Sequence, residues 1–361
     1  MIVMGTNRIT TAPDRQPDVG VGAIDKIFKL WQVDEAWSLR ERRGFTWWGG
    51  DFRQRVWVDD GRDDNGIFIY QLSAVTDFVC GVDPQAPAVA GLLADLNRFA
   101  SSYAMMLDTV ARRISLCSSV ALHEQNAEWI VHCFSALAMI QPIDAQSRAE
   151  GCAEMLGGTP DTSCHPSSGV RVTHDDMLNL IDAVYRPQGR EPSRWVTSGE
   201  FEQIPSMLMK YGFFSTGGKD GLSAELSFGN ETAFITADGG QPHPQLGNGV
   251  LLLLKFPVTL LAPMAACLAT ELNATDANNF AGSHLMGAWC STEISRGRHI
   301  PVFASFVPNM LFRPGLLLAL ILSLGQKARW ARTEIAPYVG ADIGLPYPFN
   351  QNLSRGEHEQ G

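Results

Sequence analysis

The sequence predicts an α+β fold made of two tandem copies of one domain, each with the element order α-β-β-β-α-β-β-α and an antiparallel sheet packed by helices. Three observations support it. The length of 361 residues exceeds the size at which a single hydrophobic core usually stops growing. Two short motifs recur in the same order along the chain. In each half, helical periodicity gives way to the alternation typical of strands.

The repeated motifs define the two copies. Residues 43–50 (RGFTWWGG) and 211–218 (YGFFSTGG) share a Gly-Phe pair followed after three residues by Gly-Gly. Residues 97–102 (NRFASS) and 278–283 (NNFAGS) share Asn-x-Phe-Ala. The second copy is longer between the motifs, and a Gly/Pro-rich stretch at 238–244 accounts for the difference as an extended turn.

An amphipathic helix is expected to open each copy, because apolar residues recur there at helical spacing. The apolar positions are Val21, Ile24, Ile27, Phe28 and Trp31 in the first copy, and Met177, Leu180, Ile181 and Val184 in the second. In the second copy Thr173 precedes Asp176 by three residues, which resembles a capping box at a helix start.

Strands follow these helices. Apolar and polar residues alternate over 52–58 and 222–228, as in strands with one buried face, whereas 68–79 and 250–256 read as more deeply buried strands. The next helix is expected after Asp83-Pro84 in the first copy and near Pro263 in the second.

A pair of strands and a final helix complete each copy. The clearer strands are 114–121 and 302–307, and the final helices are expected over 127–140 and 316–330.

The boundaries follow from composition. Small residues dominate 157–171, which is typical of a linker. The sequence therefore predicts a first repeat at 20–156, a linker at 157–171, a second repeat at 172–338 and a loose polar tail at 339–361.

Composition limits the function. A formal charge of −10 and a pI near 5.3 repel phosphate backbones, so we expect no nucleic-acid partner. The first twenty residues lack the apolar stretch of a signal peptide, and the most apolar runs are too short or interrupted to cross a bilayer, so we expect no membrane partner. Seven cysteines in largely apolar surroundings fit free thiols in a reducing compartment, which predicts a cytoplasmic protein.

The predicted element order resembles the type III secretion chaperone-like fold and the YbjN-like bacterial proteins that share it. The resemblance covers nearly the whole chain and rests on element order. It implies a protein that dimerises, binds extended segments of other proteins and is not an enzyme. Two copies in one chain would replace the dimer with an intramolecular pseudo-dimer, and two chains could still form a homodimer.

No constellation of residues predicts a catalytic or cofactor-binding site. The glycines at 217–221 lack the spacing of a phosphate-binding loop, and there is no G-x-S-x-G motif for a nucleophilic serine. The alternative function is that of a metal-binding protein or metal-dependent enzyme using His123, Glu128 and His132, of which Glu128 and His132 would share one helix face.

The candidate partner-binding residues combine aromatic and arginine side chains, which dominate binding hot spots. They are Trp47, Trp48, Arg53, Arg55 and Trp57. Two interpretations stay open: the residues form a contact platform, or a helix covers them and the tryptophans belong to the core. The sequence therefore predicts a non-catalytic protein-binding or chaperone-like module that binds a protein or peptide and needs no cofactor.

Overall fold

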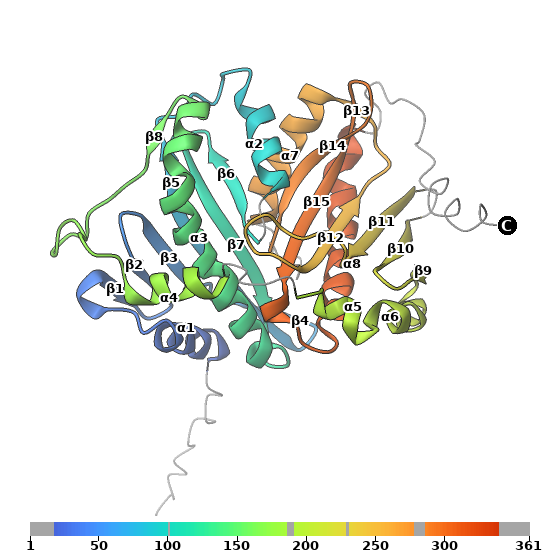
Figure 1. Cartoon of the computed structure of the whole chain (residues 1–361), viewed down its shortest axis with the longest axis horizontal. Helices are drawn as coiled ribbons and strands as arrows, with labels where there is room; N and C mark the ends of the chain where they lie inside the picture. Colours follow the sequence, from blue (N-terminus) through green and yellow to red (C-terminus); the bar gives the residue numbers. More distant parts are fainter. Residues whose placement is uncertain (1–17, 100–101, 186–190, 229–230, 278–285, 339–361) are drawn as a thin grey trace, which may run out of the picture.

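The computed structural model describes most of the chain (Figure 1), namely residues 18–99, 102–185, 191–228, 231–277 and 286–338. These residues form two antiparallel sheets with helices packed against them, which confirms the predicted α+β class. The predicted tail, 339–361, and the second Asn-x-Phe-Ala motif, 278–283, lie outside the described residues.

The first half contains one sheet in which the strands lie in the order β1-β2-β3-β5-β7-β6, while β4 and β8 pair with β5. Its elements are α1 (Val19–Leu30), β1 (Ser38–Glu41), β2 (Gly44–Trp48), β3 (Arg53–Val58), β4 (Arg62–Asp64), β5 (Ile67–Cys80), α2 (Val89–Arg98), β6 (Ala104–Asp108), β7 (Arg113–Leu122), α3 (Ala127–Leu156), β8 (Thr159–Pro160) and α4 (Asp176–Tyr185).

The second half contains the other sheet, in the order β9-β10-β11-β12-β15-β14, because residues 302–304 of β15 pair with β12 on one side and with β14 on the other. Its elements are α5 (Arg194–Ser198), α6 (Glu200–Leu208), β9 (Phe214–Gly217), β10 (Gly221–Phe228), β11 (Glu231–Asp238), β12 (Gly249–Lys255), β13 (Leu260–Leu261), α7 (Ala262–Ala277), β14 (Ala288–Ser295), β15 (Arg298–Pro308) and α8 (Leu316–Ile335).

The two halves have the same strand order across their sheets and the same order of main elements along the chain. This order contains one strand more than the sequence predicted, because a short edge strand, β1 or β9, comes before the others. Both edge strands are mostly exposed, so they lack the apolar alternation that identifies a half-buried strand.

A buried asparagine occupies the same place in both halves. At the end of α2, the Asn97 side chain accepts a hydrogen bond from Met105 N at 2.8 Å and donates one to Met105 O at 3.1 Å. On α7, Asn273 makes the same pair of bonds with Trp289, at 2.7 and 2.8 Å. The counterpart of Asn97 is therefore Asn273, which fastens helix to strand as Asn97 does, and not Asn278 of the sequence motif.

The predicted linker at 157–171 belongs structurally to the first half. β8 pairs with the end of β5, Asp161 N donates to Phe78 O at 2.9 Å, and Ser163 N donates to Asp51 O at 3.0 Å. α4 follows this segment and packs against α3. The chain therefore leaves the first half only after α4.

The helix that packs on the first strands of the second half is α6, and not α4 as the sequence predicted. α6 packs on β9 and β10, as α1 packs on β2 and β3, and it buries Phe201, Ile204 and Leu208. α4, which carries the predicted stripe, packs against the last helix of the first half instead. The stripe correctly predicted a helix but not its neighbours.

The two halves meet through α2 and α7, which lie side by side between the sheets (Figure 1). Gln71 Nε2 of β5 donates to Ala277 O at the end of α7 at 2.9 Å, and the His243 ring lies 3.1 Å from Phe99 O. Each half thus contributes contacts to the other. Among the described residues, no helix is long and apolar enough to cross a membrane.

Candidate functional site

Two of the five predicted binding residues, Trp47 and Trp48, are buried in the core and are not available to a partner. Trp47 Nε1 donates to Gln54 Oε1 at 2.8 Å beneath the helices. On the opposite face of β2, Trp48 Nε1 donates to Ser163 Oγ at 3.0 Å, and the His165 ring packs edge-on at 5.0 Å. The residues after β8 fold back over this face, a long-range contact that the local pattern of β2 does not reveal.

The other three, Arg53, Arg55 and Trp57, share one face of β3 and remain at least partly accessible. Arg55 stacks on Trp57 at 5.0 Å and lies 3.9 Å from a carboxylate oxygen of Glu41. Arg53 Nε lies 2.8 Å from Asp77 Oδ2. Because neighbouring carboxylates neutralise both arginines, this face offers a single accessible aromatic side chain and little net positive charge.

The metal alternative finds no support in the geometry. His123 precedes α3, whereas Glu128 and His132 lie on its first turns. No three His, Cys, Asp or Glu residues within the described ranges are placed so that they could hold a metal ion. His123, Glu128 and His132 therefore do not come together as a ligand set.

Two loops of the same conformation were not predicted from the sequence. Residues 165–169 (HPSSG) and 243–247 (HPQLG) adopt the same conformation, in which histidine and glycine form an isolated bridge and the glycine has a positive φ. In both loops the histidine Nδ1 accepts hydrogen bonds from two backbone N–H groups. An accepting Nδ1 places the proton of a neutral ring on Nε2. The His-Pro-x-x-Gly spacing was visible in the sequence, and its role here is to fix loops.

α4 exposes part of its apolar stripe. Leu178 points inward and is buried, while Leu180 is 57% and Val184 58% exposed, and Met177 and Ile181 are half-buried. The helix starts where Met177 N donates to Asp175 Oδ1 at 2.9 Å. An amphipathic helix normally buries its apolar stripe against another element. The stripe of α4 is therefore a surface that a partner could cover.

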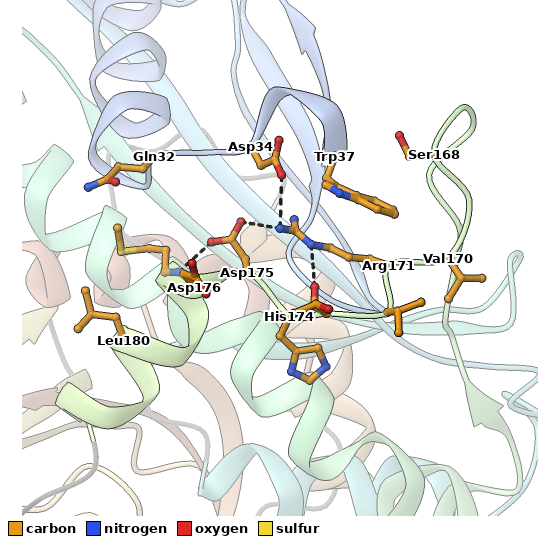
Figure 2. Close-up of a pocket in the computed structure, with 13 residues that line it drawn as sticks. Gln32, Asp34, Trp37, Ser168, Val170, Arg171, His174, Asp175, Asp176 and Leu180 are labelled. Carbon is orange, nitrogen blue, oxygen red and sulfur yellow. Dashed lines mark hydrogen bonds and ion pairs between the residues drawn. The ribbon is translucent and has the colours of Figure 1, made fainter.

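A cavity of about 690 Å³ lies beside this stripe (Figure 2). It is bounded by the turn after α1, by residues 168–176 and by the first turns of α4. The residues lining it are Gln32, Asp34, Trp37, Ser168, Val170, Arg171, Val172, Thr173, His174, Asp175, Asp176, Met177 and Leu180.

Arg171 holds the walls of this cavity together. Its Nη2 lies 3.2 Å from Asp175 Oδ2 and 3.6 Å from Asp34 Oδ2, as Figure 2 shows. Nη1 donates to Trp48 O at 2.7 Å, and the guanidinium lies 5.3 Å from the Trp37 ring. Arg171 is thus committed to structural contacts.

Apart from Arg171, the side chains that line the cavity are mainly acidic or apolar. Three aspartates line it against the one engaged arginine. Val170 is exposed and Val172 is 92% exposed, and both line the cavity together with Leu180. Such a surface suits an apolar group that carries positive charge.

A second apolar patch lies at the far end of the molecule, beside β9 (Figure 1). Met207, Met209, Tyr211 and Phe214 are all exposed, and Phe214 is 70% exposed. Among the described strands β9 pairs with β10 alone. This patch has apolar area, but its four residues do not line the cavity beside α4.

Comparisons with known proteins add no relative. No family model, curated protein or solved structure matches the chain. The resemblance to the type III secretion chaperone-like fold therefore stays a prediction, and the function has to be inferred from the surfaces and cavities of the chain itself.

Proposed function

We propose that this protein is a non-catalytic protein-binding module that receives an apolar, basic segment of a partner protein on the exposed stripe of α4 and in the adjoining acidic cavity. The observation that carries the proposal is the stripe itself. α4 has helical spacing of apolar residues, yet Leu180 and Val184 face solvent. Contiguous apolar surface of this kind marks interaction sites in soluble proteins.

The energy available at this surface supports binding of moderate strength. Complete burial of a fully exposed leucine stabilises a complex by about 1.5–3 kcal/mol. Because Leu180 is 57% exposed, its burial by a partner would contribute about 1 kcal/mol. Val170, Val172 and Val184 would add similar amounts, so the surface can act as the apolar centre of an interface.

Charge favours a basic partner. The cavity lining carries Asp34, Asp175 and Asp176 against the single Arg171, which pairs with Asp34 and Asp175, so the lining keeps a net negative charge. The chain as a whole carries a formal charge of −10. An acidic surface speeds encounter with basic proteins and disfavours acidic ones.

This function agrees with the resemblance to type III secretion chaperones and YbjN-like proteins, which implies binding of extended protein segments in the cytoplasm. It moves the contact site from the predicted tryptophan and arginine residues of β2 and β3 to α4. We propose that the partner is a protein and not a nucleic acid, since the site is acidic.

Photo-crosslinking in cells tests the site. The photoreactive amino acid benzoylphenylalanine is placed at Leu180 in one full-length chain and at Phe214 in a second, and crosslinked proteins are identified by mass spectrometry. We expect the position at Leu180 to capture a protein with a basic, apolar segment that the position at Phe214 does not capture. The same partner captured equally from both positions, or a crosslink at Phe214 only, would place the binding site elsewhere.

The isolated partner segment then gives the affinity. Replacing Val184 with serine should raise the Kd about fivefold, because half-exposed valine burial is worth about 1 kcal/mol. Replacing Met310, an exposed residue before α8, with serine serves as the matched control and should leave the Kd unchanged. Equal effects of the two substitutions would contradict the proposed contact.

A further inference from the structure

The chemistry of the α4 surface is matched by a segment of this chain itself. Residues 1–17 precede the described part of the chain, which begins at Asp18. Residues 2–4 (IVM) are apolar, Arg8 follows them, and residues 1–13 contain no acidic side chain. The segment is thus apolar and basic, which suits the acidic, apolar cavity of Figure 2 and the exposed stripe beside it.

Residues 339–361, which follow the described part of the chain, lack this composition. They carry Asp342, Glu357 and Glu359 against the single Arg355, a formal charge of −2. The lining of the cavity is also negative, so the two repel each other. Charge therefore selects residues 1–13 over residues 339–361 as an occupant of the α4 surface.

The segment is long enough to reach this surface. The 12 residues of α1 rise about 1.5 Å each, so the helix ends about 18 Å from Asp18. Gln32 and Asp34, which line the cavity, follow directly after α1. An extended chain covers about 3.3 Å per residue, so residues 1–17 can span about 55 Å. More than about 30 Å of the segment then remains for the cavity and for α4, whose 10 residues are about 15 Å long.

The order of the groups along the segment agrees with the order of the groups on the surface. Counted from Asp18, the segment presents first Asp14, then Arg8 and last its apolar residues 2–4. The surface presents first two lysines in a shallow pocket on α1, then the aspartates of the cavity, and last the exposed stripe of α4. Each charged group of the segment therefore has a group of opposite charge within its reach, and the apolar residues have an apolar surface.

We propose that residues 1–13 occupy the α4 surface of their own chain when no partner is bound, with Arg8 at the aspartates of the cavity and residues 2–4 on the exposed stripe. The inference rests on the proposed function, because it names a competitor of the partner for the same surface. A segment tethered by a short linker acts at an effective concentration of about 1 mM. With a Kd of about 1 mM it fills about half of the sites, and a partner has to displace it.

Crosslinking within the purified protein tests the inference without any partner. Benzoylphenylalanine replaces Leu180 in the full-length chain, and equal amounts of isotope-labelled and unlabelled chains are mixed before irradiation. Peptide masses then distinguish crosslinks within one chain from crosslinks between two chains. We expect crosslinks from this position to residues 1–13 of the same chain. Absence of these crosslinks, crosslinks between chains only, or an equal yield from benzoylphenylalanine at Phe214 would overturn the inference.

Charge reversal locates the contact. Arg8→Glu should lower the crosslink yield about fivefold, because it places a negative charge beside the aspartates of the cavity. Arg15→Glu makes the same change in net charge and is the matched control. Arg15 lies at most about 10 Å from Asp18 along an extended chain, so it cannot reach the cavity beyond the end of α1, and the yield should stay unchanged. An equal loss in both variants would refute the contact of Arg8.

The combined outcomes separate this inference from the proposed function. Capture of a partner protein at Leu180 in cells, without crosslinks to residues 1–13 in the purified chain, would refute the inference and leave the proposed function standing. Crosslinks to residues 1–13 without capture of any partner protein in cells would support the inference and contradict the proposed function.

Discussion

Lys327 of α8 is fully buried, and its removal should cost the protein much of its stability. Its Nζ lies 2.5 Å from Asp276 Oδ2 on α7 and 4.5 Å from the centre of the Phe303 ring. Asp276 also accepts a hydrogen bond from Trp289 Nε1 at 2.9 Å. The pair connects the final helix of the second half to its central helix and its sheet.

The magnitude follows from two opposing energies. At 2.5 Å and an effective dielectric constant of about 20, the attraction is about 7 kcal/mol. Removing both ions from water costs several kcal/mol for each, so the intact pair contributes little net stability. Lys327→Met or Asp276→Asn alone leaves one buried charge without its partner and should lower the free energy of unfolding by about 3–5 kcal/mol.

The dependence on pH gives a second signature. Burial lowers the pKa of Lys327, and Asp276 opposes that effect. In Asp276→Asn the opposition is lost, so the native state binds fewer protons than the unfolded state below the ordinary lysine pKa of 10.5. The free energy of unfolding of this variant should therefore rise as the pH increases toward that value, because burying a neutral lysine costs less free energy than burying a charged one.

Urea unfolding followed by tryptophan fluorescence, at several pH values between about 6 and about 10, measures both effects. The double variant Lys327→Met, Asp276→Leu serves as the control, because it removes both charges and should recover most of the lost stability. Single variants that lose less than about 1 kcal/mol, or a double variant that is no better than either single one, would refute the reasoning.

Three further predictions concern packing and reactivity. Gly22→Ala should stabilise the protein by about 0.5–1 kcal/mol, because an added Cβ on α1 meets no atom within 4 Å. Gly44→Ala should destabilise it by about 1–3 kcal/mol, because its Cβ would lie 2.6 Å from the backbone oxygen of Val56, and thermal unfolding compares the two variants. Asn97→Ala and Asn273→Ala should each cost about 2 kcal/mol in urea unfolding, and clearly unequal losses would show that the two asparagines are not equivalent. Since burial raises the pKa of Cys117 to about 12, iodoacetamide at a pH of about 8 should leave it unmodified in the native protein and modify it in urea.

The sequence pattern predicted correctly those elements that pack against parts of the chain close to them in sequence. The alternation over β3 is reproduced as alternating burial, and the apolar positions Ile24 and Ile27 of α1 are buried. The apolar pattern was sufficient in these elements because the apolar face of each packs against the nearest hydrophobic core.

Long-range contacts account for what the sequence could not predict. Periodicity identified the stripe of α4 but cannot specify whether another element covers it, and here solvent covers Leu180 and Val184. Trp48 is buried by residues more than a hundred positions later in the chain. The charged cluster at Asp144 likewise joins Tyr103 to α3 across a strand hairpin, a contact without a sequence signature.

α4 forms a wall of two cavities. One is the cavity of Figure 2, and the other, of about 600 Å³, lies on the inner side of the helix, where α3 and residues 244–246 form further walls; His174 lines both. A displacement of this helix would therefore change the shape of both cavities together. A partner that binds one position of α4 more tightly than another would shift the helix toward that position and would alter the inner cavity with it.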